Sequence, residues 1–153
     1  ARHAAREAKD LAVACKEVIS ALVEEGRTLF AERVQAYLPE GDQFGLLLSG
    51  EGRSRCSFGL MRAGQLHSAL SGAEWARLTL ALGASICPTG PDVLAILTPE
   101  ERAFDAATLR RVMVALTDAP GQVILTSPIK PKGRTPKGWT VIEIGGATAD
   151  AHL

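Results

Sequence analysis

The first 37 residues contain no proline and are rich in alanine, and this uninterrupted stretch constrains the fold more than any other feature of the chain. Apolar side chains recur in it with the spacing of the a and d positions of a heptad seam. These side chains are Leu11, Cys15, Val18, Leu22 and Leu29. The spacing predicts one long helix, which the turn-forming residues 39–42 (Pro-Glu-Gly-Asp) bring to an end.

Two arrangements fit this helix. It can be an amphipathic helix that packs on its own domain, or it can be the end of a coiled coil that leads into a globular head. Glu25 and Glu32 occupy two of the would-be core positions, and Gly26 weakens the middle of the helix. Because two to three heptads do not decide between the two, residues 1–38 are predicted to form a long helix, with the coiled coil as an open alternative.

The rest of the chain alternates short apolar runs with helical patterns. Helices are predicted at residues 71–86 and 105–116, and strands at 43–48, 56–61, 92–97, 122–126 and 139–144. Strands that alternate with helices of this length are typical of an α/β domain whose sheet is at least partly parallel. We therefore expect an α/β domain over residues 39–146 and a flexible tail over 147–153.

Charge and cysteine content exclude several classes of protein. Seventeen basic and seventeen acidic residues give a net charge of zero, which excludes a broad electrostatic footprint for nucleic acid but not a local patch. No apolar run approaches the ~20 residues of a membrane span, so no membrane partner is expected. The three cysteines are far apart and form no metal-binding pair, so we expect no metal site and a cytoplasmic location.

The segment at residues 70–74, Leu-Ser-Gly-Ala-Glu, begins the predicted helix 71–86. Ser71 is a good N-cap, and Glu74 three residues later completes a capping box. The free N–H groups at a helix N-terminus and a serine hydroxyl attract anions, and a neighbouring small residue lets a phosphate approach. The segment is therefore a candidate phosphate-binding site.

This segment, followed by a helix rich in Arg, Leu and Ala, resembles the signature motif of ABC-type ATPases, whose usual form is Leu-Ser-Gly-Gly-Glu. The elements that follow have the order of that family. An apolar strand is followed by Phe104-Asp105, which resembles the D-loop, and then by strand 122–126, where the family has the strand before its switch histidine. The order resembles above all the C-terminal lobe of SMC-like repair and recombination ATPases, over roughly residues 11–144.

The resemblance implies a P-loop NTPase-like lobe with a mostly parallel sheet flanked by helices. In SMC-like ATPases a coiled coil is inserted between two lobes, and its returning helix enters the second lobe just before the signature, where residues 1–38 stand here. The implied function is a role in DNA recombination, repair or phage DNA metabolism, with ATP and Mg²⁺ bound across a homodimer or with a complementary ATPase lobe. The implied ATP-binding residues are Ser71, Gly72, Ala73 and Glu74, with Asp105 in the D-loop.

The sequence departs from the family at the residues that would hydrolyse ATP. It contains no Walker A phosphate loop, so ATPase activity requires that loop in cis or in trans. The two Walker B carboxylate positions hold Thr98 and Pro99, and the switch-histidine position holds Ser127. Either the lobe is degenerate and binds nucleotide without effective hydrolysis, which we favour, or Glu100 serves as the base while phosphates and the missing loop hold Mg²⁺.

One concentrated basic segment lies between the last two predicted strands. It contains Lys130, Lys132, Arg134 and Lys137 among prolines and glycines. It is either a solvated hairpin loop or a contact for DNA phosphates. The second possibility supports an alternative function, in which the chain is a non-enzymatic DNA- or protein-interaction module on an ABC-like scaffold.

Overall fold

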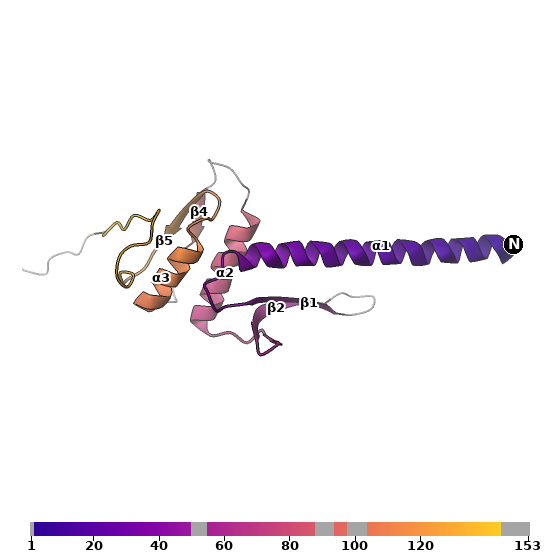
Figure 1. Cartoon of the computed structure of the whole chain (residues 1–153), viewed down its shortest axis with the longest axis horizontal. Helices are drawn as coiled ribbons and strands as arrows, with labels where there is room; N and C mark the ends of the chain where they lie inside the picture. The colour runs from indigo at the N-terminus through magenta and orange to yellow at the C-terminus, as the bar shows by residue number, and fades with distance from the viewer. Residues whose placement is uncertain (1, 50–54, 88–93, 98–103, 145–153) are drawn as a thin grey trace, which may run out of the picture.

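The computed structural model describes residues 2–49, 55–87, 94–97 and 104–144 (Figure 1). Its helices are α1 (Arg2–Gln35), α2 (Gly72–Ile86) and α3 (Ala106–Ala115). Its strands are β1 (Phe44–Ser49), β2 (Arg55–Arg62), β3 (Gln65–His67), β4 (Leu94–Leu97) and β5 (Gln122–Leu125). The chain is therefore a mixed α/β protein, as the sequence predicts.

The N-terminal helix α1 has 34 residues, which corresponds to a length of about 51 Å. Most of it projects away from the rest of the molecule (Figure 1). Leu11, Val18 and Leu22 of the predicted seam are 66%, 59% and 62% exposed, whereas Val34 near the C-terminal end is completely buried. The long helix is thus confirmed, and only its last turns pack on the domain that follows.

The first sheet is antiparallel and contains β1, β2 and β3. The pairing of β1 with β2 runs from Phe44 opposite Leu60 to Ser49 opposite Arg55. The third strand was not predicted, because three residues are too short for a recognisable alternation. It follows a tight turn in which Gly64 has a φ of +76°, a conformation that favours glycine.

This sheet lies beside the C-terminal part of α1 (Figure 1). The Phe30 and Phe44 rings meet edge to face with their centroids 6.1 Å apart. Arg27 donates a hydrogen bond from Nη1 to the Leu46 carbonyl oxygen at 3.2 Å. The ring pair and the hydrogen bond fix the sheet against the helix.

Helix α2 lies at the centre of the domain and is covered on two faces. Leu78 and Ala81 pack against the end of α1 and the antiparallel sheet. Ala76, Leu80 and Ala84 pack against α3 and the residues that follow it. The second group of buried residues is completed by Phe104, Leu109, Val112, Met113 and Leu116. The two hydrophobic clusters share α2, which therefore holds the two halves of the domain together.

The structure corrects the prediction of a mostly parallel sheet. Of the strands that the structure describes, three form the antiparallel sheet and only β4 and β5 pair in parallel. The predicted strand at 139–144 is also wrong, since residues 139–144 form no strand. Its apolar residues match a strand pattern, but no described strand supplies a hydrogen-bonding partner for them, and Val141, Ile142 and Ile144 are exposed.

Within the described ranges, no helix has both the length and the apolar character to cross a bilayer.

Candidate functional site

The N-terminus of α2 carries the signature-like segment, and its first turn is a capping box. Ser71 is the N-cap, with an extended backbone, and its side chain faces the backbone N–H of Glu74. In return, the Glu74 carboxylate accepts a hydrogen bond from the Ser71 backbone N–H at 2.8 Å. The predicted capping box is confirmed.

Glu74 is held from a second side by the antiparallel sheet. Arg62, the last residue of β2, forms an ion pair from its Nη2 atom with Oε1 of Glu74, while Oε2 accepts from Ser71. The Phe58 ring of the same strand meets the Trp75 ring edge to face, with centroids 6.0 Å apart. Both contacts fix the first turn of α2 relative to β2.

A third contact anchors α2 one turn further along. The Arg77 guanidinium donates to both carboxylate oxygens of Asp42, from Nε at 2.6 Å and from Nη2 at 3.2 Å. Both side chains are largely buried, at 12% and 14% exposed. A two-pronged pair of this kind fixes orientation as well as distance, so the turn after α1 also helps to position α2.

The first turn of α2 keeps donors available at the surface. Ser71 and Gly72 are exposed, and the backbone N–H groups of Gly72 and Ala73 have no hydrogen-bond partner within the described ranges. Ala73 itself is half-buried and packs against the cluster between α2 and α3, so its methyl group has a place in the core. The unpaired donors, the serine hydroxyl and the positive end of the helix dipole can together bind an anion.

Asp105 is the N-cap of α3. One carboxylate oxygen accepts from the backbone N–H groups of Ala107 and Thr108, each at 2.9 Å, and the other accepts from the Thr108 hydroxyl at 2.8 Å. The backbone hydrogen bond from Thr108, then that from its hydroxyl, hold the pKa of Asp105 below its ordinary value. The carboxylate is thus occupied by its own helix, and its predicted capping role is confirmed.

The predicted catalytic carboxylate, Glu100, lies outside the described residues, as do Thr98 and Pro99. Ser127, at the switch-histidine position, is exposed, and its hydroxyl accepts from the Ile129 backbone N–H at 3.2 Å. The described part of the chain contains no cluster of three or more His, Cys, Asp or Glu residues that could hold a metal ion.

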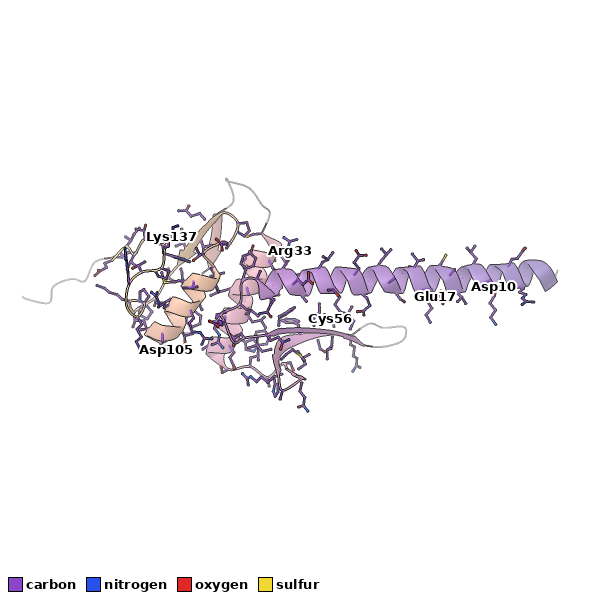
Figure 2. All side chains as sticks on the ribbon, in the orientation of Figure 1. Asp10, Glu17, Arg33, Cys56, Asp105 and Lys137 are labelled. Atoms are coloured by element: carbon purple, nitrogen blue, oxygen red, sulfur yellow. The ribbon has the colours of Figure 1, made fainter. Side chains whose placement is uncertain are left out.

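The basic segment is not a hairpin loop in the described part of the chain, because residues 139–144, which follow it, form no strand. It lies along α3 instead. The Lys132 backbone N–H donates to the Ala106 carbonyl at 2.8 Å, and the Trp139 indole N–H donates to the Met113 carbonyl at 2.8 Å. Figure 2 shows Asp105 and Lys137 towards opposite ends of α3. We call residues 129–139 the basic strap.

No local sequence pattern identifies two of the residues at these sites, Arg62 and Arg110. Arg62 reaches Glu74 only because β2 ends beside the first turn of α2. Arg110 of α3 donates from Nη1 to the Arg134 carbonyl of the basic strap. A local pattern finds neither residue, since each depends on how distant segments pack.

No protein-family model matches this chain, and no match was found among curated proteins or solved structures.

Proposed function

We propose that this chain is the signature-bearing lobe of an ABC-type, SMC-like ATPase that acts on DNA in recombination or repair. In this proposal Ser71, Gly72 and Ala73 face the γ-phosphate of an ATP molecule held by the phosphate loop of another lobe. The ATP is shared across an interface, either with a second copy of the protein or with a complementary lobe. The lobe contributes binding, while its own hydrolytic positions are degenerate.

The observation that carries the proposal is the pairing of Glu74. A carboxylate one turn into the helix would repel a phosphate if its charge faced the site. Here one of its oxygens pairs with Arg62 and the other accepts from the Ser71 backbone N–H. The charge of Glu74 is thereby compensated, and the positive helix end remains the dominant local field.

The Ser71 side chain has the right polarity for this role. Its oxygen faces the Glu74 backbone N–H, so the hydroxyl proton remains available to donate. That proton and the N–H groups of Gly72 and Ala73 would supply donors to phosphate oxygens. Mg²⁺ and the β-phosphate would be held by the phosphate loop of the other lobe, which the present sequence does not contain.

The test is ATP-dependent association of the native gene product that contains this chain, measured as mass in solution with and without a non-hydrolysable ATP analogue. Ser71→Arg fills the anion site with a bulky cation and is expected to abolish association. Ser68→Arg is the matched control, because Ser68 is also exposed and lies just before α2. It is expected to leave association unchanged.

Ser68→Arg should unfold at the same temperature as the unmodified protein, because its side chain is exposed. Ser71→Arg loses the N-cap of α2 and is expected to lose about 1 kcal/mol of stability, so both variants are compared at a temperature at which both are folded. If Ser71→Arg associates like the control in the presence of the analogue, the signature proposal is wrong.

A further inference from the structure

We infer that the basic strap and α3 together form a binding surface for the backbone phosphates of a nucleic-acid duplex, separate from the N-terminus of α2. The surface combines Arg110 of α3 with Lys132, Arg134 and Lys137 of the strap. Lys130 is excluded from it. The inference does not depend on the proposed nucleotide site.

The strap follows α3 from its first residue to beyond its last. Lys132 is joined to Ala106 at the start of the helix, and Arg134 is joined to Arg110 one turn later. At the far end Gly138 lies beside Thr117, and Trp139 is bonded to Met113. The contacts from Ala106 to Met113 cover about 10 Å of the axis of α3, so the strap residues that carry the cations follow one another along this helix.

The row is held in place rather than carried on a loose loop. Pro136, which lies between Arg134 and Lys137 in the sequence, is buried, and Gly138 turns the chain with a φ of +86°. An open hollow in the surface is lined by Arg110, Arg134, Thr135, Pro136 and Lys137. A fixed row of donors loses less conformational entropy on binding than a flexible one does.

The charges of this row are not neutralised within the described residues. Arg110, Lys132, Arg134 and Lys137 form no ion pair there, whereas Lys130 pairs with Glu143 at 2.7 Å. Helix α3 itself contains no carboxylate. Asp105, which precedes it, already accepts three hydrogen bonds from the first turn, and Asp118 follows its opposite end. A net-neutral chain therefore has a local positive surface here.

The chemistry of the surface favours the backbone of a duplex. A duplex carries one negative charge for about every 1.7 Å of its axis, which suits a row of cations. Binding of single strands relies on aromatic side chains that stack on bases. The one aromatic residue of the strap, Trp139, is half-buried and bonded to Met113 through its indole N–H. Among the described residues, the hollow itself has one apolar lining residue, Pro136, which is buried, so the hollow offers polar and charged groups to a partner.

The experiment measures the affinity of the full chain for a labelled DNA duplex of mixed sequence over a series of salt concentrations. The test variant is Arg134→Gln with Lys137→Gln, and the matched control is Lys130→Gln, a cation of the same strap that Glu143 already pairs. Arg110 is left intact, because its side chain holds the strap. Both proteins are first checked for an unchanged melting temperature.

Each lost phosphate contact lowers the slope of log affinity against log salt by about 0.9. When the variant and the unmodified chain bind equally at 1 M salt, each lost contact makes the binding of the variant at 0.1 M salt about eightfold weaker. For the double variant we therefore expect a slope that is lower by about 1.8 and an affinity at 0.1 M salt that is about sixtyfold weaker, whereas Lys130→Gln binds the duplex like the unmodified chain.

Four results overturn the inference: no duplex binding by the unmodified chain, an equal loss in the Lys130→Gln control, an unchanged slope in the double variant, or tighter binding to single-stranded DNA, an acidic peptide or anionic vesicles than to the duplex.

Discussion

Arg62 and Glu74 form an ion pair that joins the end of β2 to the first turn of α2. The same Glu74 carboxylate accepts the Ser71 backbone N–H, so one side chain ties the N-cap to a neighbouring strand. The pair connects the antiparallel sheet, which lies beside α1, to the segment that we propose contacts ATP. The position of the signature-like turn therefore depends on the sheet as well as on its own helix.

The Arg62–Glu74 pair predicts a measurable coupling energy. Glu74 is 16% exposed on its side chain and Arg62 is 49% exposed, so the pair is partly shielded from water. In a double-mutant cycle with Arg62→Gln and Glu74→Gln, we expect a coupling of about 0.5–1 kcal/mol in the free energy of unfolding, measured in urea. The cycle of Glu74→Gln with Arg55→Gln, at the other end of β2, should show none. A coupling of zero for the first cycle would show that the pair does not form in solution.

The hydrogen bonds that Asp105 accepts at the N-terminus of α3 predict how its substitution changes the stability of the chain. Asp105→Ala removes the acceptor for two backbone N–H groups and is expected to lower the urea concentration at the unfolding midpoint. Asp105→Asn keeps an oxygen at the cap and should restore most of the loss. Equal destabilisation by both variants would mean that the negative charge, and not the hydrogen bonding, is responsible.

The lowered pKa of Asp105 also predicts how this contribution changes with pH. A carboxyl whose folded pKa lies below its ordinary value of 3.8 stabilises the fold fully above that value, and the contribution is lost as the pH falls through the folded pKa. The difference in stability between the unmodified chain and Asp105→Ala should therefore shrink below about pH 3.8. If the difference is the same at pH 3 and pH 7, the pKa of this carboxyl is not lowered in the folded chain.

The hydrogen bond from the Trp139 indole anchors the basic strap, and removing it is expected to lower the free energy of unfolding. Trp139→Phe keeps the aromatic ring but removes the indole N–H that donates to the Met113 carbonyl at 2.8 Å. We expect the free energy of unfolding to fall by about 1 kcal/mol. Val141→Ala, at an exposed position two residues later, is expected to change it by less than about 0.5 kcal/mol. Similar effects of the two variants would contradict the anchoring role of the indole.

The core of the domain and the projecting part of α1 predict very different costs of removing a leucine side chain. Leu78 of α2 is completely buried, and Leu78→Ala is expected to destabilise the chain by about 2–5 kcal/mol. Leu22 of α1 is 62% exposed, so Leu22→Ala should cost less than about 0.5 kcal/mol in the isolated chain. A large cost at Leu22 would show that the predicted seam is buried by a partner in solution.

The elements that the sequence predicts well are those encoded by neighbouring residues. The long α1, the capping box of Ser71 and Glu74 and the cap at Asp105 depend on contacts within four residues, so their patterns are visible in the sequence. The arrangement of the strands depends on which segments meet in space. The predicted strand at 139–144 failed for this reason, since its apolar alternation found no partner strand among the described residues.

The same distinction applies to the candidate sites. Ser71 and Gly72 could be selected from the sequence because the signature-like motif coincides with the predicted start of a helix. Arg62 and Arg110 contact residues that are distant in the sequence, so they leave no local pattern. Lys130 shows the converse case. The sequence groups it with the other cations of the basic segment, but the returning chain places Glu143 beside it.

The most direct test of the proposed nucleotide site is cross-linking from the γ-phosphate of ATP. The native gene product is incubated with an ATP analogue that carries a photoreactive group on that phosphate, irradiated and digested with trypsin. The account predicts that the label appears on the peptide of residues 63–77, which contains Ser71, and that excess ATP prevents the labelling. Labelling that spares this peptide while marking the rest of the protein would contradict the account.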